Sequence, residues 1–359
     1  MKILVISQLP PPVHGSSLMT QRLIETLSDL QISVSLLDRR MSKTASEVGR
    51  GSVRKMFAAL DYWRRAIQCG RNRHDIILVF LADRVPSYML DEVAIRLLST
   101  KQSQVLVYLH SANVSRLTNL RLIGPVLRRR LGNSRSVIVL NELLASEFAE
   151  VVARDRMVVI PNSPSVPTLE LGREEPGARN GSPPRFVYLS NWIPAKGALD
   201  FVRFAEAVLD DVPDAEFDLC GSTSDVVFQR QVIEAVASSR AAARINVHGA
   251  VLGADKWRIL RSGACLVFPS THPQEAQPLV VIEAMSQGLP VVAYDVGGLR
   301  AMANGRPCLR TVRAGDFREL AVAAVDIASK DLSGDALHTW REIYGPEAFS
   351  NAWRDLLNP

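Results

Sequence analysis

The most informative absences in this 359-residue sequence are those of long apolar runs and of paired cysteines. No window approaches the run of about 18 apolar residues that a transmembrane helix needs, and the apolar start is too short for a signal peptide. The four cysteines have no paired spacing, which excludes a disulfide scaffold and offers no zinc site. We therefore expect a cytoplasmic protein in which Cys265 is a buried thiol.

Short nucleotide and metal motifs are also missing from the sequence. There is no Walker loop, and no G-x-G-x-x-G follows the first predicted strand, which argues against P-loop and nicotinamide enzymes. No D-x-D triplet and no cluster of carboxylates or histidines with metal-ligand spacing is apparent. We therefore expect no metal and no cofactor. Low-complexity segments and short repeats are absent as well.

What the chain does contain is a regular alternation of short apolar runs and longer helical patterns. It is 47% hydrophobic and 22% charged, an ordinary globular composition, and its length suggests two domains. Several runs are almost continuously apolar, as parallel strands buried on both faces should be. The predicted strands are 2–7, 32–38, 75–81, 104–110, 136–140 and 157–161 in the first half, and 185–189, 216–220, 244–248, 265–269, 290–294 and 308–312 in the second.

This order predicts two doubly wound α/β domains that face each other across a cleft. Residues 1–163 form the first domain, and residues 164–184, rich in proline, glycine and charge, form a linker. Residues 185–340 form the second domain. We expect the last segment, 341–359, to be a helix that packs back on the first domain.

Positive charge is concentrated in the first half of the chain. Residues 1–170 carry a net charge of +9 and residues 171–359 a net charge of −4, within a total of +5. Much of the excess lies in 50–73, where Met56, Phe57, Tyr62 and Trp63 are interleaved, and in 116–135, which contains RRRLG. Two solvated helix faces would explain it, and so would a surface for anionic lipid head groups. Nucleic acid is not expected, because no aromatic stacking platform or DNA-reading helix motif is evident.

A stretch of the second half, EAQPLVVIEAMSQGLP at 275–290, places two carboxylates eight positions apart. Pro278 suits the first position of a helix, and Gly288 suits its C-terminal end. Glu275 would then lie on the loop before the helix, and Glu283 about one turn into it.

The start of that helix suits an anion. The backbone N–H groups of Leu279 and Val280 would be free there, and the helix dipole favours negative charge. A carboxylate on either side of a phosphate makes sense when the ligand also carries hydroxyl groups, for which carboxylates are strong acceptors. A loop glutamate and a solvated helix glutamate with no ligand are the alternative.

Other polar residues fall at the ends of predicted strands, where ligands bind in such sheets. Gly15 and Ser16, within PPPVHGSS, would let a ligand approach a helix start, although simple capping explains them too. Lys196, within SNWIPAKG, suits phosphate oxygens, or is a surface lysine beside a glycine turn. His110 could hydrogen-bond a substrate hydroxyl, or could be structural.

Together these features resemble family 4 of the glycosyltransferases (glycosyl transferases group 1), retaining enzymes with the two-domain fold called GT-B. The resemblance spans nearly the whole chain, although the first domain matches in layout only. The matching motifs are E-x7-E from Glu275 to Glu283 with its trailing GLPVV, the pair Lys196–Gly197, FPS at 268–270, PNS at 161–163 and the Pro–Gly loop at 10–17.

The resemblance implies a role for each candidate residue, with the first domain binding the acceptor and the second the nucleotide sugar. Glu283 would hold the ribose of a UDP- or GDP-linked sugar, whereas Glu275 and His110 would sit beside the transferred sugar. The resemblance also implies groups that would bind the diphosphate or lie near the acceptor. These are Lys196, the amides of Leu279 and Val280, Gly15, Ser16 and Asn191.

Two positions depart from the family pattern. Asn191 stands where the family usually has an arginine, five positions before the lysine, and GGLRAM has Ala301 where a glutamate is frequent. Losing a cation weakens leaving-group stabilisation. Arg300 is a candidate substitute.

The function expected from the resemblance is a retaining, metal-independent hexosyltransferase. It would move a sugar from a nucleoside diphosphate sugar to a hydroxyl of a lipid-linked or saccharide acceptor, in cell-surface polysaccharide or glycolipid synthesis, with peripheral binding at the inner face of the membrane. A nucleotide-sugar epimerase or a phosphorylase of the same fold is an alternative, although no lysine motif for pyridoxal phosphate is present. An inactive donor-binding partner subunit is another, which Asn191 and Ala301 leave open.

Overall fold

The computed structural model describes residues 1–11, 13–39, 53–99, 103–111, 113–167 and 183–358. Pro12 of the predicted first loop, Arg50 at the start of one basic stretch, and most of the predicted linker lie outside the described residues. The chain divides into two compact units: Met1–Ser165 with Pro346–Pro359, and Val166–Gly345.

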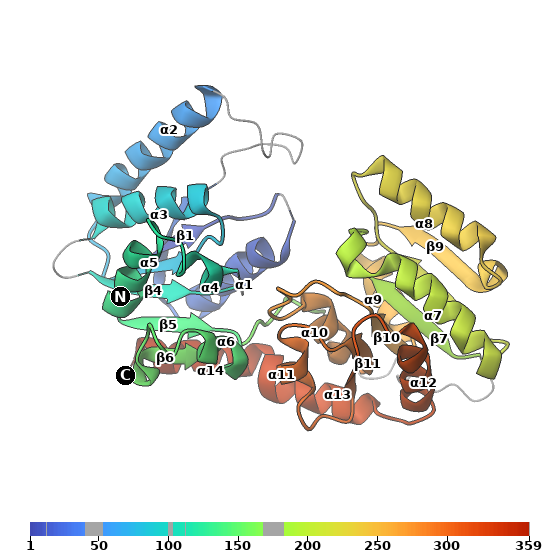
Figure 1. The fold of residues 1–359 in the computed structure, drawn as a ribbon. Helices are drawn as coiled ribbons and strands as arrows, with labels where there is room; N and C mark the ends of the chain where they lie inside the picture. The colour runs from blue at the N-terminus through green and yellow to red at the C-terminus, as the bar shows by residue number, and fades with distance from the viewer. Residues whose placement is uncertain (12, 40–52, 100–102, 112, 168–182, 359) are drawn as a thin grey trace. The chain divides into compact units, whose positions relative to one another are not determined.

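Unit 1 is a six-stranded sheet of parallel strands in the order β2-β1-β3-β4-β5-β6 (Figure 1). Its strands are β1 (Lys2–Ser7), β2 (Ser33–Asp38), β3 (Ile76–Phe80), β4 (Gln104–Tyr108), β5 (Ser136–Val139) and β6 (Met157–Val159). Its helices are α1 (Gly15–Asp29), α2 (Val53–Gly70), α3 (Val85–Leu98), α4 (Val114–Leu117), α5 (Gly124–Asn133), α6 (Glu142–Glu147), the 3-10 turn η2 (Arg154–Arg156) and α14 (Pro346–Leu357).

Helix α14 is far from the rest of unit 1 in sequence and is nevertheless part of it. The buried Trp353 meets Tyr108 of β4 edge-on, with ring centroids 5.6 Å apart. The Arg135 guanidinium donates a hydrogen bond to the carbonyl of Leu356 at 3.2 Å. Burial of a tryptophan holds the end of the chain on the sheet, because aromatic side chains contribute a large apolar area.

Unit 2 is a second six-stranded parallel sheet, in the order β12-β11-β10-β7-β8-β9. Its strands are β7 (Arg185–Leu189), β8 (Glu216–Cys220), β9 (Ile245–Gly249), β10 (Cys265–Phe268), β11 (Val291–Tyr294) and β12 (Leu309–Val312). Its helices are η3 (Pro194–Lys196, 3-10), α7 (Ala198–Asp211), α8 (Val226–Ser238), η4 (Ala242–Arg244, 3-10), α9 (Gly253–Ser262), α10 (Leu279–Ser286), α11 (Leu299–Ala303), α12 (Phe317–Ala328), α13 (Ser333–Thr339) and the π-turn η5 (Trp340–Tyr344).

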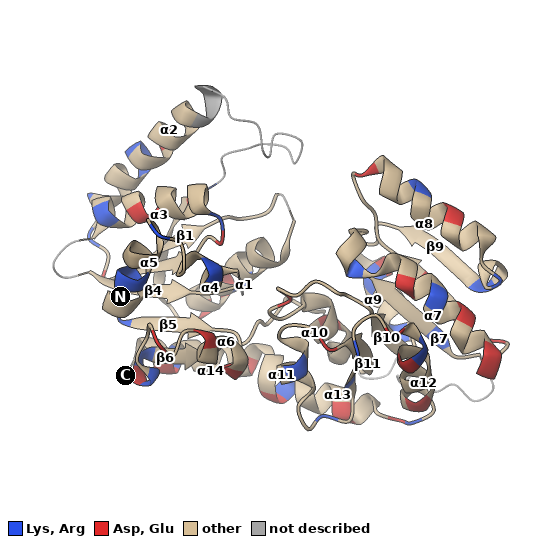
Figure 2. Cartoon of the chain, viewed as in Figure 1, with Lys and Arg blue, Asp and Glu red and all other residues tan. Residues whose placement is uncertain are grey.

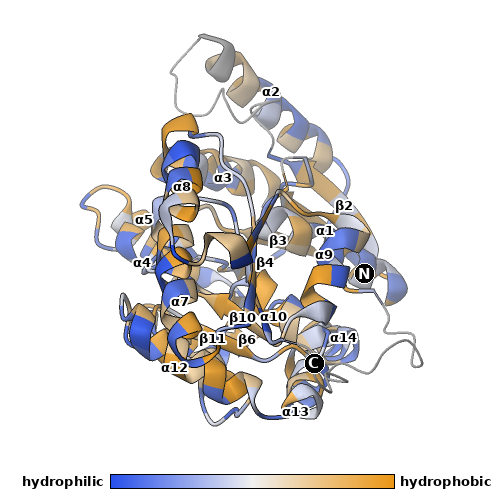
Figure 3. Ribbon diagram, turned by 90° about the vertical axis from the view of Figure 1, so that its right-hand side faces the viewer, coloured by the Kyte–Doolittle hydropathy of each residue, from blue (hydrophilic) through white to orange (hydrophobic). Residues whose placement is uncertain are grey.

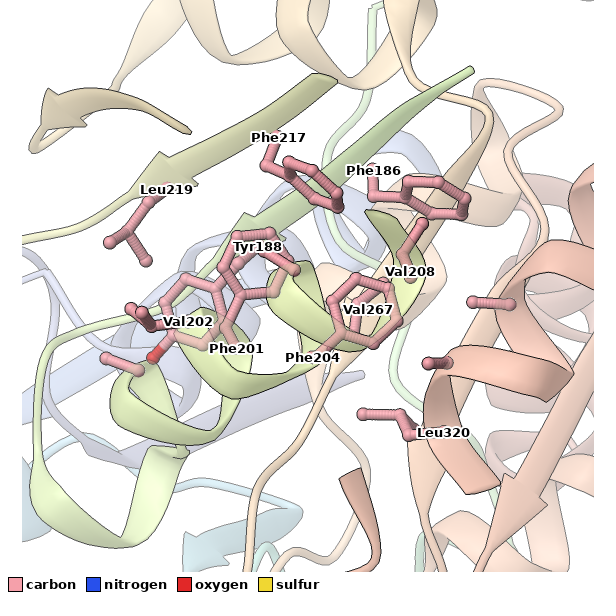
Figure 4. Packing of buried hydrophobic residues seen from close by; sticks show 14 of the residues in the cluster. Phe186, Tyr188, Phe201, Val202, Phe204, Val208, Phe217, Leu219, Val267 and Leu320 are labelled. Atoms are coloured by element: carbon pink, nitrogen blue, oxygen red, sulfur yellow. The ribbon is translucent and has the colours of Figure 1, made fainter. Parts of the chain in front are cut away.

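Hydrophobic clusters fill both faces of the unit 2 sheet. On one face, buried aromatic side chains of β7, β8 and α7 pack together, and Figure 4 shows Phe186, Phe201, Phe204 and Phe217 in one group. On the other face, the apolar residues of α10 pack on the sheet with those of α13. Helix α10 is therefore held rigidly, which matters because it carries one of the candidate carboxylates.

The predicted fold class is confirmed in both units. Each of the twelve predicted strands is present, with ends that differ by at most two residues. Burial of Cys265 is also confirmed, and all four cysteines are free thiols. In the described part of the chain, no helix is both long enough and apolar enough to span a membrane.

Candidate active site

The strand order places two candidate loops of unit 2 beside one another. Strand order reverses between β7 and β10, which are neighbours in the sheet although two strands and three α-helices separate them in sequence. The loops after these two strands carry Lys196 and Glu275. In open α/β sheets, ligands bind outside the carboxyl ends of the strands at such a reversal.

Lys196 and Glu275 form an ion pair at this reversal, between Nζ and Oε1. The lysine side chain is 22% exposed and the carboxylate side chain 9% exposed. The Ser270 hydroxyl donates to the same Oε1 atom at 2.8 Å and is itself buried. A carboxylate that is bound by a cation and a hydroxyl is fixed in orientation, so Glu275 presents its remaining oxygen in a defined direction.

Gly197 explains why the lysine loop can come so close to the loop after β10. Its φ of +78° lies in the left-handed region, and a Cβ atom there would stand 2.0 Å from the carbonyl oxygen of Pro269. Only glycine avoids both the strain and the overlap. The Thr271 N–H then donates to the Ala195 carbonyl at 2.8 Å, which ties the two loops together.

The glycine pair after β11 holds Glu275 from the other side. The Gly298 N–H donates to the backbone carbonyl of Glu275 at 2.6 Å. Gly297 has a φ of +50°, and a Cβ atom at this position would lie 2.3 Å from that same carbonyl oxygen. Glycine at this position therefore lets a third loop close on the Glu275 backbone, which stabilises its position.

Helix α10 begins one residue later than predicted. Pro278 is extended, with a ψ of 125°, and serves as the N-terminal cap, so that Leu279 is the first helical residue. Leu279 and Val280 are half-buried, and their N–H groups belong to the first turn, where no intrahelical acceptor exists. Glu283 follows one turn later and is only 6% exposed. The helix start therefore keeps the predicted character of an anion site.

Glu283 has a partner that the sequence did not suggest. Nζ of Lys256, on α9, donates to Glu283 Oε1 at 2.8 Å, and the lysine side chain is 17% exposed. The same Nζ lies 4.2 Å from the ring centroid of Trp257, which adds a cation–π contact. No spacing rule links positions 256 and 283, because only the packing of α9 beside α10 brings them together.

Of the two departures from the family pattern, Asn191 is exposed and Ala301 is half-buried. Asn191 lies on the loop after β7. The Arg300 side chain is 76% exposed and forms an ion pair with Asp295. Hydrogen bonding and attraction by Asp295 raise the pKa of Arg300. Arg300 is therefore neutralised by Asp295 in this structure, and its use as a substitute cation would require that pair to break.

In unit 1, the loop after β1 leads into α1 through an N-terminal cap that is a histidine rather than a serine. Nδ1 of His14 accepts the Ser17 N–H at 3.2 Å, while the His14 N–H donates to Ser17 Oγ at 3.0 Å. Partial burial, together with the positive charge of Arg39, lowers the pKa of His14. Gly15, exposed, and Ser16, half-buried, form the first positions of α1, and the Ser16 hydroxyl lies 3.1 Å from the same Nδ1.

His110 lies just beyond β4, in a group of aromatic rings. It stacks on Phe80 with a centroid distance of 4.6 Å and lies 3.9 Å from the Tyr108 ring. Burial lowers the pKa of His110 to about 3, while a hydrogen bond with Asn162 acts in the opposite direction. Its Nε2 atom is buried with no hydrogen-bond partner among the described residues. His110 is thus a neutral imidazole, which can exchange hydrogen bonds but cannot act as a cation.

Asp83, which follows β3, was not among the predicted residues. Strand order in unit 1 reverses between β1 and β3, so Asp83 lies at the corresponding reversal of this unit. It accepts the Ser111 hydroxyl at 3.0 Å and the Asn113 side-chain amide at 3.3 Å. Its position after a buried strand was the only signal in the sequence.

No group of three or more histidine, cysteine, aspartate or glutamate side chains that could hold a metal ion occurs among the described residues. The polar groups gathered in unit 2 are instead two lysines, two glutamates, a serine hydroxyl and the amides at the start of α10. Such a set offers cations and N–H donors for phosphate oxygens, and carboxylates for hydroxyl groups.

Solved structures with this fold define the class. A glycosyltransferase from Rickettsia africae ESF-5 superposes with a TM-score of 0.75 at 16% identity, covering 99% of this chain and 97% of that one. The sucrose-phosphate synthase of Thermosynechococcus elongatus gives 0.74 at 19% identity, covering 99% and 98%. Anabaena Alr3699/HepE in complex with UDP-glucose gives 0.68 at 15% identity over all of both chains. The chain therefore has the GT-B fold.

The family match is narrower than the fold match. Residues 183–330 match the model of the family described as Glycosyl transferases group 1, which confirms the resemblance drawn from the motifs of the second half. This range contains Lys196, Glu275, Glu283 and Lys256. No curated protein sequence matches the chain.

Proposed function

We propose that the protein is a glycosyltransferase that moves a sugar from a nucleoside diphosphate sugar to an acceptor hydroxyl with retention of configuration. The observation that carries the proposal is the meeting of Lys196, Glu275 and the start of α10 at the strand reversal of a group 1 glycosyltransferase domain. The family match supports the reaction class. The side chains support the ligand class, because they pair phosphate-binding groups with hydroxyl acceptors.

In this proposal, unit 2 binds the donor. Glu283 accepts hydrogen bonds from the ribose hydroxyls, and Lys256 neutralises its charge from the opposite side. The amides of Leu279 and Val280 bind the diphosphate. Glu275 accepts from a hydroxyl of the transferred sugar through the oxygen that Lys196 and Ser270 leave open.

The chemical step is the departure of the diphosphate. The bond between the anomeric carbon and the phosphate oxygen breaks with its electron pair going to the diphosphate, whose growing charge Lys196 and the α10 dipole stabilise. The acceptor oxygen forms its bond on the same face of the sugar, and its proton passes to the departing phosphate oxygen. No group in this sequence of events requires a metal ion.

Unit 1 would bind the acceptor. The start of α1 at Gly15 and Ser16 suits an anionic or hydroxyl-bearing group, and neutral His110 offers an imidazole to a sugar hydroxyl. The acceptor class that we propose is a lipid-linked or saccharide acceptor of cell-surface polysaccharide or glycolipid synthesis. The +9 net charge of residues 1–170 supports an acceptor held at an anionic membrane surface.

Donor binding is the first test, since it needs no acceptor. Calorimetry with UDP, GDP and ADP should show that one nucleoside diphosphate binds, and Lys196→Ala should weaken it. Lys330→Ala is the matched control, because this lysine lies in the same unit, is 54% exposed and is paired with Asp326. Failure of all three nucleotides to bind at millimolar concentration would refute the proposal.

Turnover of the matching nucleotide sugar is the second test. Lys196→Ala should reduce turnover by about a hundredfold or more, the usual effect of removing one positioned transition-state donor. Products should include a glycosylated acceptor. Conversion of the donor to an epimer without any transfer would identify the epimerase alternative. Tight nucleotide binding with no turnover on any acceptor would identify an inactive donor-binding subunit.

A further inference from the structure

Helix α2 is apolar on two opposite faces. Its inner face packs within unit 1: Tyr62 and Ala66 are fully buried, and Trp63 Nε1 donates to the Leu90 carbonyl of α3 at 3.2 Å. Trp63 is half-buried and packs against the core of unit 1, so it is less available to a partner than the exposed residues of the helix.

The outer face of α2 carries large apolar side chains that nothing in the described chain covers. Each helical residue advances the side-chain direction by about 100°, which places the exposed residues within one sector of about 100°. We refer to them as the α2 outer stripe: Met56 (58% exposed), Phe57 (61%), Leu60 (51%) and Ile67 (51%). Figure 3 shows apolar and polar residues interspersed along α2. Contiguous exposed apolar residues of this size mark an interaction surface.

Positive charge exceeds negative charge in the stretch that contains the stripe. Between residues 50 and 73 the sequence has seven lysines and arginines but a single acidic residue, Asp61. Arg64 lies within the stripe sector, is 61% exposed and pairs with Asp61. Arg71 and Arg73 follow the helix and are exposed. Figure 2 shows lysine and arginine positions in blue along α2. An apolar face bordered by excess positive charge matches an interfacial helix on an anionic bilayer.

The other basic region of the sequence is partly engaged in contacts within unit 1. Arg130, on α5, is only 16% exposed and donates twice to the carboxylate of Glu92, at 2.9 and 3.0 Å. Arg128 donates to the Thr118 carbonyl at 3.1 Å. These contacts hold α5 within unit 1. Arg130 is therefore not part of a free basic face, whereas Arg128 and Arg129 are exposed.

We propose that the α2 outer stripe docks on the surface of an anionic lipid bilayer, with its apolar side chains in the head-group boundary and its arginines on the lipid phosphates. This deepens the proposed function, for which a lipid-linked acceptor would be held at that surface. The docking itself needs no donor and no turnover, so it is tested separately.

The test is flotation of the full chain with vesicles. Wild type should bind vesicles of phosphatidylcholine mixed with phosphatidylglycerol, bind phosphatidylcholine alone weakly, and lose most of its binding in high salt. The triple variant Phe57→Ser, Leu60→Ser, Ile67→Ser should bind the mixed vesicles about 100-fold more weakly, because three large apolar side chains no longer leave water. Arg71→Glu with Arg73→Glu should weaken binding about tenfold or more.

The matched control is Val226→Ser, Val227→Ser, Ile233→Ser, which removes three exposed apolar residues from α8 of unit 2 (66%, 69% and 43% exposed). It should bind vesicles like wild type. All variants should keep the circular dichroism and nucleoside diphosphate affinity of the wild type, which separates a docking defect from misfolding.

Several outcomes would overturn the inference. Wild type that does not float with anionic vesicles would do so, and so would a stripe variant that floats as well as wild type. A wild-type dimer that the stripe variant converts to a monomer, with vesicle binding unchanged, would identify a second copy of the chain as the true occupant. None of these results bears on donor binding, which tests the proposed function.

Discussion

Replacing Lys256 by methionine should destabilise unit 2 through Glu283. Methionine keeps most of the packing volume of the lysine stem but removes the charge that Glu283 Oε1 meets at 2.8 Å. The carboxylate side chain, only 7% exposed, would then be buried without a counterion. Removing one partner of a buried pair costs more than the pair contributes, because the other charge is left unpaired.

The expected size follows from the geometry. Two unit charges at 2.8 Å attract by about 6 kcal/mol at an effective dielectric constant of about 20. Desolvation offsets part of this, and broken buried pairs cost about 3–5 kcal/mol in measured cases. The lysine side chain is 17% exposed, which favours the lower end, so we expect a loss of about 3 kcal/mol.

The assay is urea denaturation at neutral pH, with a double-mutant cycle. Lys256→Met with Glu283→Gln should recover more than half of the loss, because the buried charge is gone. Lys330→Met is the control: this lysine pairs with Asp326 at 2.7 Å, but the two side chains are 54% and 43% exposed. Its replacement should leave stability unchanged within the precision of the assay.

A Lys256→Met protein within about 0.5 kcal/mol of wild type would refute the reasoning, since that is the effect of an ordinary surface substitution. A double variant no more stable than the single one would also count against it. The loss would then come from packing of the lysine stem and not from the charge of Glu283.

Three further expectations concern other parts of the structure. Gly197→Ala should lower the free energy of unfolding by about 2 kcal/mol or more beyond the loss caused by Gly249→Ala, as measured by urea denaturation. Both glycines have a positive φ, but only at Gly197 would a Cβ atom overlap a backbone oxygen. Equal losses would mean that the loop carrying Lys196 moves to avoid the overlap. The pKa of His110 falls from 6.5 to about 3 on folding, so His110 stays neutral in the folded protein while the unfolded chain takes up a proton. Lowering the pH from 7 to 5 should therefore cost unit 1 about 2 kcal/mol of stability. His110→Phe should make stability less dependent on pH in this range, and an unchanged slope would contradict the pKa shift. EDTA should leave transfer intact, and activity that disappears and returns with manganese would overturn the metal-free mechanism.

The strands were predictable because parallel strands buried on both faces must be nearly continuous apolar runs. Arg185–Leu189 and Glu216–Cys220 appear with their predicted ends. The start of α10 was predicted one residue too early because proline suits both the N-terminal cap and the first helical position. Only the backbone ψ angle of Pro278 distinguishes the two positions. Which face of α2 is exposed was not predictable, because a helix with apolar residues on two faces does not show which face is buried.

The candidate site was predictable where a residue lies at a strand end, and not where its partner comes from another element. Lys196 and Glu275 follow their strands, so the sheet order alone places them together. Lys256 was missed because an ion pair between distant segments leaves no periodic pattern. Ser270 was named within the FPS motif, but its hydrogen bond to Glu275 was not predicted. The roles assigned to the predicted residues stay predictions until ligand binding is measured.

The pairing of Lys196 with Glu275 and of Lys256 with Glu283 has a consequence for which ligands the protein can select. A group of unpaired cations would attract any polyanion, including inorganic pyrophosphate and nucleic acids. Here each lysine already pairs with a carboxylate, so a phosphate must displace that carboxylate to bind the lysine. A ligand gains from the exchange only when it also gives each carboxylate a hydroxyl to bind. If the proposed function holds, sugar-bearing nucleotides do this and bare phosphates do not, so the paired charges would disfavour bare phosphates.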